Sequence, residues 1–312
     1  MLFLQILTAM SNPTKLKILI PILLVAFFCA HAWHKHEQLE NDITGSLQGR
    51  ELDEISGIAA SGINNNLYYI ENDSGDTSRF FSINPTGKNY ATIYFKGDSK
   101  EEFGVNDCED IAVGPGPIAG KSYLYDGDIG DNYSEHPYIT VYRMEEQKDW
   151  ADTGIKHAIA VPIHFKYPDG PKDAESLMID PIEKLIYIVS KRRDSVGIYT
   201  SPLIYKPNDT LILTLRGKLF FGGIKPFKWI TAGDISKDGT QILLRSYDKV
   251  YYWQRPLNEP VWKVMLTQKP QELPYTMEKQ GEAIGFTPDG KGYYTTSEGV
   301  YSPIYYYKIP GK

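Results

Sequence analysis

The sequence predicts an all-β fold, a five-bladed β-propeller of four-stranded blades, on three observations. Aromatic residues make up 13% of the 312 residues, with 23 tyrosines and 12 phenylalanines, and such side chains favour half-buried pleated strands. A unit of short apolar strands and turns occurs five times. After the first 32 residues there is no sustained 3.6-residue apolar pattern, which argues against a parallel α/β fold.

The five units begin at intervals of 53, 66, 56 and 51 residues, a spacing that suits four-stranded blades. Each unit opens with a small or acidic residue and a short apolar strand. A turn of Gly, Pro, Asn and Asp residues follows, then an aromatic-rich second strand, a polar loop and a third strand. We predict second strands at 67–70, 122–125, 185–190, 241–245 and 292–296, and third strands at 79–83, 138–143, 196–200, 249–253 and 304–309.

Outer strands are predicted at 91–97, 158–166, 211–217 and 262–267. The fifth unit has none, but residues 43–49 precede the first unit and can complete the last blade. This closes the ring and leaves no open sheet edge. A six-bladed ring is the alternative, although no spare stretch is long enough to build a sixth blade.

The N-terminus reads as an export signal covering residues 1–32. Lys15 and Lys17 precede an apolar run over 18–28, and Ala30-His31-Ala32 is an A-x-A cleavage site. A linker over 33–42 would then lead to the propeller domain over 43–312. We expect an exported protein, periplasmic or secreted. The alternative is a membrane anchor, if the signal is not cleaved.

Charge is distributed unevenly over the predicted blades. The formal net charge of −6 argues against a nucleic-acid partner, and we expect a monomer. Loops on one face are rich in charge, at 71–76, 126–132, 191–194, 246–248 and 297–299. Because loops on a rigid scaffold carry function, this face is expected to take a small-molecule or phosphate-containing ligand. Solvated turns without a ligand are the alternative.

One residue per unit is expected at the entrance of the central channel: Ser56, Glu109, Glu175, Thr231 and Glu282. The turns 236–239 and 287–290 match, which aligns Thr231, rather than Asp234, with Glu282. Three converging glutamates repel one another unless a counter-charge is present. Calcium takes six to eight oxygen ligands, which this set can supply, whereas zinc and copper prefer His or Cys. Magnesium is second choice, and glutamates bonded to channel amides are the alternative without an ion.

This order of ring residues resembles the calcium-activated nucleotidases, or soluble apyrases, five-bladed propellers with a central calcium ion. The matching stretches are Glu54-Ile55-Ser56, Glu109-Asp110-Ile111-Ala112, Ala174-Glu175-Ser176 and Glu282-Ala283-Ile284, with Asn72-Asp73-Ser74-Gly75 and the pair Arg192-Arg193. Thr231 stands where that family has a serine. The inner-strand pattern is also similar to calcium-dependent phytase-like and lactonase-like propellers.

The resemblance implies calcium-assisted hydrolysis of a phosphoanhydride. Arginines would stabilise the developing negative charge, and an aspartate would orient or deprotonate water. The candidates are Asp73, Asp128, Asp131, Arg192, Arg193 and Arg245.

Two other functions are open. The chain could be a binding module whose calcium ion is structural, because many propellers only bind. A glycosidase would need a pair of carboxylates and exposed aromatic rings in the channel mouth, for which Trp229 and Tyr247 are the candidates.

Overall fold

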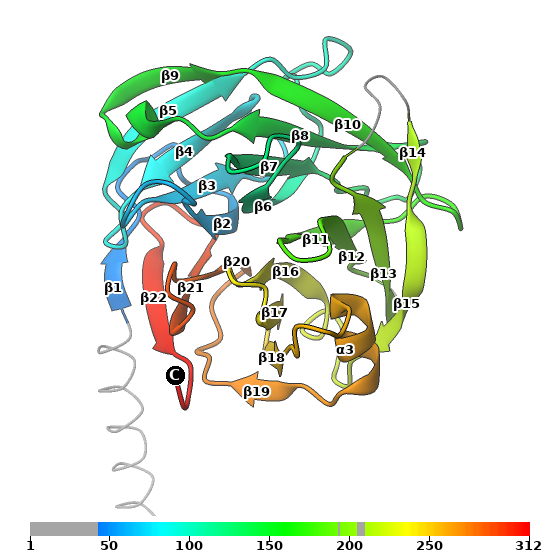
Figure 1. Cartoon of the computed structure of the whole chain (residues 1–312). Coiled ribbons are helices and arrows are strands. Elements are labelled where there is room, and N and C mark those ends of the chain that lie inside the picture. Colours follow the sequence, from blue (N-terminus) through cyan, green and yellow to red (C-terminus); the bar gives the residue numbers. More distant parts are fainter. Residues whose placement is uncertain (1–42, 193, 205–209) are drawn as a thin grey trace, which may run out of the picture. The chain divides into compact units, whose positions relative to one another are not determined.

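Five mainly antiparallel sheets surround a central channel in the computed structural model, which describes residues 43–192, 194–204 and 210–312 (Figure 1). Each sheet is one blade, and the predicted five-bladed propeller is confirmed. The strands that line the channel, one per blade, are β2 (Ile55–Ala60), β6 (Cys108–Pro115), β11 (Ala174–Asp180), β16 (Ile230–Ile235) and β20 (Gly281–Phe286).

Two further strands follow outward in each blade. The second strands are β3 (Tyr68–Asn72), β7 (Ser122–Asp128), β12 (Leu185–Ser190), β17 (Gln241–Ser246) and β21 (Gly292–Ser297). The third strands are β4 (Arg79–Ile83), β8 (Ile139–Glu145), β13 (Ser195–Pro202), β18 (Val250–Gln254) and β22 (Pro303–Lys308). Both sets overlap the predicted ranges.

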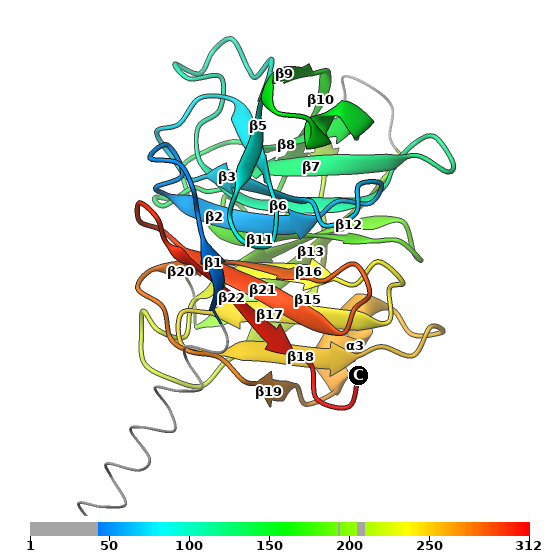
Figure 2. The ribbon, with the colours of Figure 1, turned by 90° about the vertical axis from the view of Figure 1, so that its left-hand side faces the viewer.

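The last blade is closed by the N-terminal strand β1 (Ile43–Ser46), which pairs with β22 as predicted (Figure 2). Just beyond β1, the amide of Leu47 donates to the carbonyl of Ser302 at 2.9 Å. The Leu47 side chain is fully buried in the hydrophobic cluster between the fifth and first blades. Four similar hydrophobic clusters fill the interfaces between the other pairs of neighbouring blades. The core of this propeller therefore lies between sheets.

The outer rim differs from the prediction in two places. The expected strand 158–166 is β10 (Ala160–Lys166), while the preceding strand β9 (Gly154–Ala158) joins the first blade in parallel beside β5 (Asn89–Phe95). The expected strand 211–217 is also divided. β14 (Leu211–Ile212) pairs with β10 of the second blade, and β15 (Thr214–Phe220) is the outer strand of the third.

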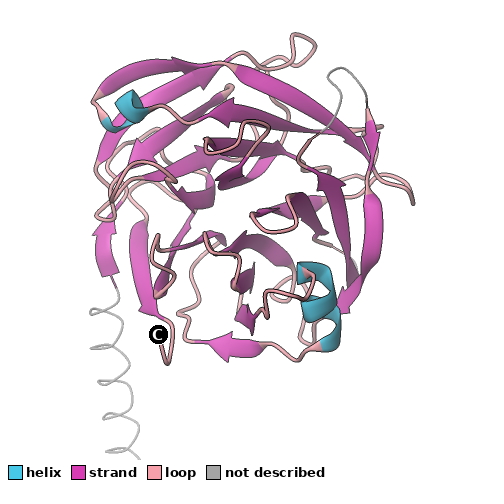
Figure 3. Cartoon of the chain, viewed as in Figure 1, coloured by secondary structure: helices cyan, strands magenta, loops and turns pink. Residues whose placement is uncertain are grey.

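A third prediction is wrong. The outer strand expected at 262–267 is the helix α3 (Val261–Thr267), and β19 (Gln271–Leu273) is the outer strand of the fourth blade (Figure 3). Val261, Val264 and Met265 are buried between the third and fourth blades. Their i, i+3, i+4 spacing is helical, but a mostly apolar segment of seven residues is too short to distinguish helix from strand. The only other helix of the described residues is the short 3-10 turn η1 (Lys148–Ala151).

The predicted signal segment 1–32 and linker 33–42 lie outside the described residues, and their roles stay predictions. In the part of the chain that the structure covers, no helix has the length and apolar character needed to cross a bilayer.

Candidate metal centre at the channel mouth

Each of the five inner strands carries a β-bulge at the same point, close to its N-terminal end. A bulge leaves one residue out of the ladder and re-aims its side chain. The five bulged residues are the predicted ring residues, Ser56, Glu109, Glu175, Thr231 and Glu282, called the inner ring below. The alignment made from the apolar pattern is therefore correct for all five blades.

The inner ring is almost completely buried, with exposed fractions of 0% to 3%. Its two hydroxyl residues connect neighbouring blades. The Ser56 hydroxyl donates to the carbonyl of Glu109 at 2.7 Å, and the Thr231 hydroxyl donates to the carbonyl of Gly281 at 3.3 Å. Both hydrogens are thus directed to backbone, and the oxygen lone pairs are still available as ligands.

A second set of side chains surrounds the inner ring. The residue that follows the second strand in the first, third, fourth and fifth blades is Asp73, Lys191, Tyr247 or Glu298, and we call these four the collar. In three blades the amide of the collar residue bonds the carbonyl two residues before the inner ring, at 2.8 to 3.2 Å: Asp73 to Glu54, Lys191 to Asp173 and Glu298 to Gln280.

In the second blade the equivalent amide belongs to Gly130, which donates to the carbonyl of Asp107 at 3.0 Å. A β-carbon there would lie 2.3 Å from Glu109 Oε1 and 2.4 Å from Asp107 Oδ2. Glycine at this position therefore makes room for two carboxylates.

Seven carboxylates meet around the inner ring. They form three groups, each with ligand oxygens within 4.8 Å of one another, and Asp73 connects the first group to the second while Glu109 connects the first to the third. The first is Asp73, Asp107 and Glu109, the second is Asp73, Glu282 and Glu298, and the third is Glu109, Asp173 and Glu175. Asp107, Asp173 and Glu298 belong to no predicted site, and Asp73 was predicted only as a catalytic residue.

Two cations contact this set. The Lys191 ammonium forms an ion pair with Glu175 and lies 3.7 Å from Glu282 Oε1, and its side chain is only 6% exposed. Arg192 pairs with Asp173, contacts Asn132 and stacks over the Trp229 ring at 5.2 Å. Two positive groups cannot balance seven carboxylates if all of these ionise.

Burial, together with the nearby carboxylates, raises several pKa values. Burial, with a contribution from Asp107, raises the pKa of Asp73 to about 7. Burial raises the pKa of Asp107 to about 6, and burial together with the nearby Glu282 raises the pKa of Glu298 to about 8. The pKa of Glu109 is also raised well above its usual range, mainly by burial. Without a further counter-charge, some of these groups hold protons near neutral pH.

Two oxygens of the inner ring have no hydrogen-bond partner among the described residues. They are Glu175 Oε2 and Glu282 Oε2, and both are buried. The second oxygen of Glu282 accepts from the Tyr247 hydroxyl at 2.5 Å. A buried carboxylate oxygen without a partner is costly, and a hard cation would satisfy both. The donor set is all oxygen, which is what calcium prefers.

Asp128 and Asp131, predicted to act on water, bind backbone instead. Asp128 Oδ1 accepts from the amides of Asn106 and Asp107 at 3.2 and 2.9 Å. Asp131 accepts from the amides of Glu135 and His136, each at 2.9 Å. Both carboxylates shape the loops around the second blade and are at most 8% exposed.

Arg245 is wholly buried between the fourth and fifth blades. Its guanidinium donates to the carbonyls of Ala283 and Thr296, at 2.5 and 3.0 Å, and to Tyr275 and Glu278, at 2.7 and 3.1 Å. It therefore joins two blades and does not face a ligand. Arg193, the other predicted arginine of the pair with Arg192, lies outside the described residues.

Asp110, the residue after Glu109, crosses the channel below the inner ring. One carboxylate oxygen accepts from the amides of Leu177 and Gly233 at 2.9 and 3.3 Å, and the other accepts from its neighbour Ile111 at 2.9 Å. These bonds connect the inner strands of the second, third and fourth blades. The fully buried Asp110 thus separates the acidic mouth from the other end of the channel.

Comparison with known proteins adds little to this description. No protein-family model matches the chain, and no curated protein matches it. Among solved structures, a chain of the "Crystal structure of Nidogen/Laminin Complex" aligns with a TM-score of 0.41 and 13% identity, over 79% of this chain and 73% of that one. A likeness of that size carries no argument about function, so the site has to be interpreted from its own residues.

Proposed function

We propose that this protein binds one calcium ion at the mouth of its channel. The observation that carries the proposal is a chain of neighbouring carboxylate groups that contains Glu109, Glu175 and Glu282, bulged residues of three blades. Glu109 and Glu175 lie in one group, Glu282 is connected to them through Asp73, and Glu175 and Glu282 each present a buried oxygen without a partner among the described residues. Calcium accepts six to eight oxygen ligands at roughly 2.3–2.6 Å. No histidine or cysteine belongs to the carboxylate groups, which argues against zinc or copper.

The three glutamates would supply carboxylate oxygens to the ion, and Ser56 and Thr231 would add hydroxyl lone pairs. Asp73 belongs to two of the carboxylate groups and is the best placed collar residue to complete the ligand set. Lys191 shares Glu175 and Glu282 with the proposed ion. The ion and the ammonium therefore compete for the same oxygens. Magnesium is the second choice of ion, because it needs a tighter octahedral shell.

The ion would serve a binding function on the loop-rich face. Calcium neutralises part of the acidic mouth, and an anionic small molecule bearing a phosphate or carboxylate can then approach beside Arg192, whose side chain is 34% exposed. Export, proposed from residues 1–32, fits this function because extracellular calcium modules work at weak affinities, with Kd values on the order of 10⁻⁴–10⁻³ M.

A second candidate function is calcium-dependent hydrolysis of a phosphate or ester. In this alternative Asp73 does not bind the ion and acts as the general base, a role that suits a carboxyl beside the inner ring whose pKa is raised by burial to about 7. The resemblance to calcium-activated nucleotidases suggests nucleoside di- and triphosphates as first substrates. Calcium-dependent phosphate release that Asp73→Asn abolishes without weakening calcium binding would support hydrolysis. Calcium binding without turnover would leave the binding function.

Thermal unfolding in calcium and in chelator tests the proposed ion. Ligand binding to the folded state alone stabilises by about 2.7 kcal/mol at a concentration near 100 Kd, which about 10 mM calcium reaches at a Kd on the order of 10⁻⁴ M, so the wild type should gain several degrees in Tm. Glu175→Gln should lose most of this gain. Glu272→Gln is the matched control. Glu272 lies on the outer strand β19, its side chain is 59% exposed, and it pairs with Lys249. An equal response of all three proteins would remove Glu175 from the site.

A further inference from the structure

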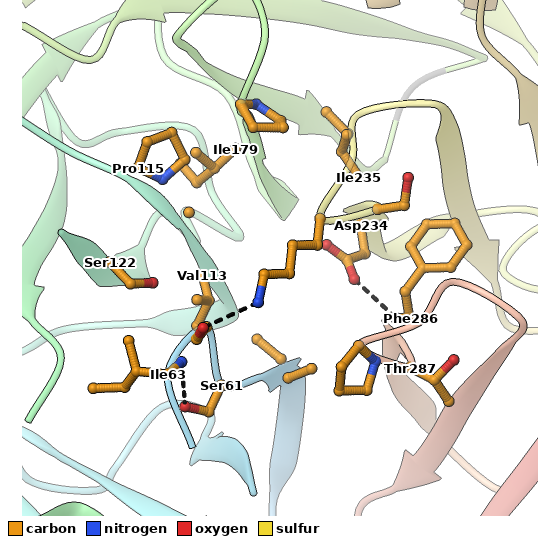
Figure 4. Close-up of a pocket in the computed structure, with 18 of the residues that line it drawn as sticks. Ser61, Ile63, Val113, Pro115, Ser122, Ile179, Asp234, Ile235, Phe286 and Thr287 are labelled. Carbon is orange, nitrogen blue, oxygen red and sulfur yellow. Dashed lines mark hydrogen bonds between the residues drawn. The ribbon is translucent and has the colours of Figure 1, made fainter. Parts of the chain in front are cut away.

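A cavity of about 370 Å³ lies at the end of the channel opposite the inner ring (Figure 4). It is lined by the C-terminal ends of all five inner strands and the turns that follow them. The inner ring occupies the N-terminal ends of the same strands. Because Asp110 crosses the channel between the two, the cavity is separate from the proposed calcium site.

The cavity wall is mainly apolar. Val113, Ile179, Ile235 and Phe286 face it from four different blades, as Figure 4 shows. A volume of this size is typical of sites for small organic molecules, which are apolar with a few placed polar groups.

Asp234 is the carboxylate in this wall. Its Oδ2 atom accepts from the amide of Phe286 at 2.8 Å, and it makes no ion pair with any residue that the structure describes. Burial raises the pKa of Asp234 to about 7. A positive donor placed in the cavity would recover the electrostatic energy that this carboxylate loses on leaving water.

Lys237, from the turn after β16, lies at the mouth of the cavity. Its ammonium donates to the carbonyl of Gly62 in the first blade at 3.0 Å, and its side chain is exposed. The exposed ammonium already has Gly62 as a partner, whereas the partly buried Asp234 has no ion-pair partner among the described residues. The group that a ligand gains most from engaging is therefore the carboxylate.

We propose that this cavity is a second binding site, for a compact apolar molecule that carries one amino group. The apolar body would pack on Val113, Ile179 and Phe286, and the ammonium would bind Asp234. The site is independent of the proposed calcium centre, because it lies at the other end of the channel and shares no residue with it.

Calorimetric titration with 2-phenylethylamine tests the proposal, with 2-phenylethanol and 3-phenylpropanoate as neutral and anionic counterparts. We expect the amine to bind at least about tenfold more tightly than either counterpart, the size of effect that one charge-assisted hydrogen bond gives. Asp234→Asn should remove this preference. The amide oxygen of the new side chain can still accept from Phe286, so the fold should be retained, which thermal unfolding checks.

Asp238→Asn is the matched control. Asp238 lies in the same turn and accepts from Ser236 and Thr240, but it does not line the cavity. This variant, and Glu175→Gln at the calcium centre, should bind the amine as the wild type does. The proposal is overturned if no probe binds below about 10 mM, if the acid or the alcohol binds as well as the amine, or if Asp234→Asn leaves amine binding unchanged.

Discussion

The Lys191 ammonium lies 3.7 Å from Glu282 Oε1 while forming an ion pair with Glu175, so one lysine contacts inner-ring glutamates from two blades. It reaches them from the collar position of the third blade, where the Asp173 carbonyl accepts from its amide. The protein therefore holds a positive charge against two of the three inner-ring glutamates. This charge offsets part of the repulsion among the carboxylates and also opposes a second cation.

Lys191→Met should bind calcium roughly tenfold or more tightly than the wild type, because a like charge within about 4–6 Å of the ion is removed. The apolar stem is kept. Calorimetric calcium titration is the measurement, with Lys249→Met as control, since Lys249 pairs with the exposed Glu272 at 2.8 Å. Unchanged or weaker calcium binding in Lys191→Met would show that the lysine does not compete with the ion.

Arg245→Met should lower the free energy of unfolding by about 3–5 kcal/mol, because it leaves the buried Glu278 without its partner. The double variant Arg245→Met, Glu278→Met should recover most of this loss, since an apolar pair often replaces a buried ion pair without cost. Urea unfolding measures both. Calcium affinity should not change in either variant. A specific loss of ligand binding or turnover in a well-folded Arg245→Met protein would instead return Arg245 to the functional site.

Asp126→Asn should flatten part of the pH dependence of stability. Asp126 is fully buried, accepts from the Cys108 thiol at 3.2 Å and has a pKa raised by burial from 3.8 to about 7. The folded state holds the Asp126 proton more tightly than the unfolded state, so this proton stabilises the folded state fully below about pH 4. That stabilisation is lost as the pH rises to about 7, at roughly 1.4 kcal/mol for each unit by which the pKa is raised.

The side-chain amide introduced by Asp126→Asn stays neutral across that range. Chemical unfolding at pH 5 and pH 8 in chelator should therefore show a smaller difference for this variant than for the wild type. The neighbouring Glu71, whose buried oxygens have no hydrogen-bond partner in the described structure, would gain a possible donor. Equal pH differences in the two proteins would mean that Asp126 ionises normally.

Leu47→Ala should destabilise the protein by roughly 2–5 kcal/mol, the usual cost of truncating a fully buried leucine. Leu47 follows the strand that closes the ring, so the loss in free energy of unfolding measures how much this closing segment stabilises the protein. Ile43→Ala in β1 itself is the control, because Ile43 is 43% exposed and its truncation should cost less than about 0.5 kcal/mol. Denaturant unfolding that does not distinguish the two variants would contradict this role for the closing segment.

The apolar repeat was sufficient to predict the blades, the closing strand and all five inner-ring positions. It assigned Thr231 correctly because two similar turns fix the register of the last two units. The same repeat also contains the collar, since Asp73, Lys191, Tyr247 and Glu298 each follow an Asn or Ser that ends a second strand. Aligning the units at that point would have found these residues.

Other features depend on long-range packing that no local pattern reports. The Lys191 side chain extends from the third blade to Glu282 of the fifth blade. The carbonyl that accepts from the Lys191 amide belongs to Asp173, which precedes the inner strand. Arg245 is a catalytic candidate that the family resemblance implies, but its guanidinium turns into the next blade. The exchange of β9 and β14 between blades likewise follows from the rim contacts and not from strand propensity.

Calcium titration of the wild type and of Glu109→Gln, Glu175→Gln and Glu282→Gln tests the central claim most directly, because each variant removes one carboxylate from a different blade. The account predicts one ion per wild-type chain, a loss of affinity of about tenfold or more in each of the three variants, and wild-type affinity in Glu272→Gln. Wild-type affinity in all three inner-ring variants, or no calcium binding by the wild type at millimolar concentrations, would contradict it.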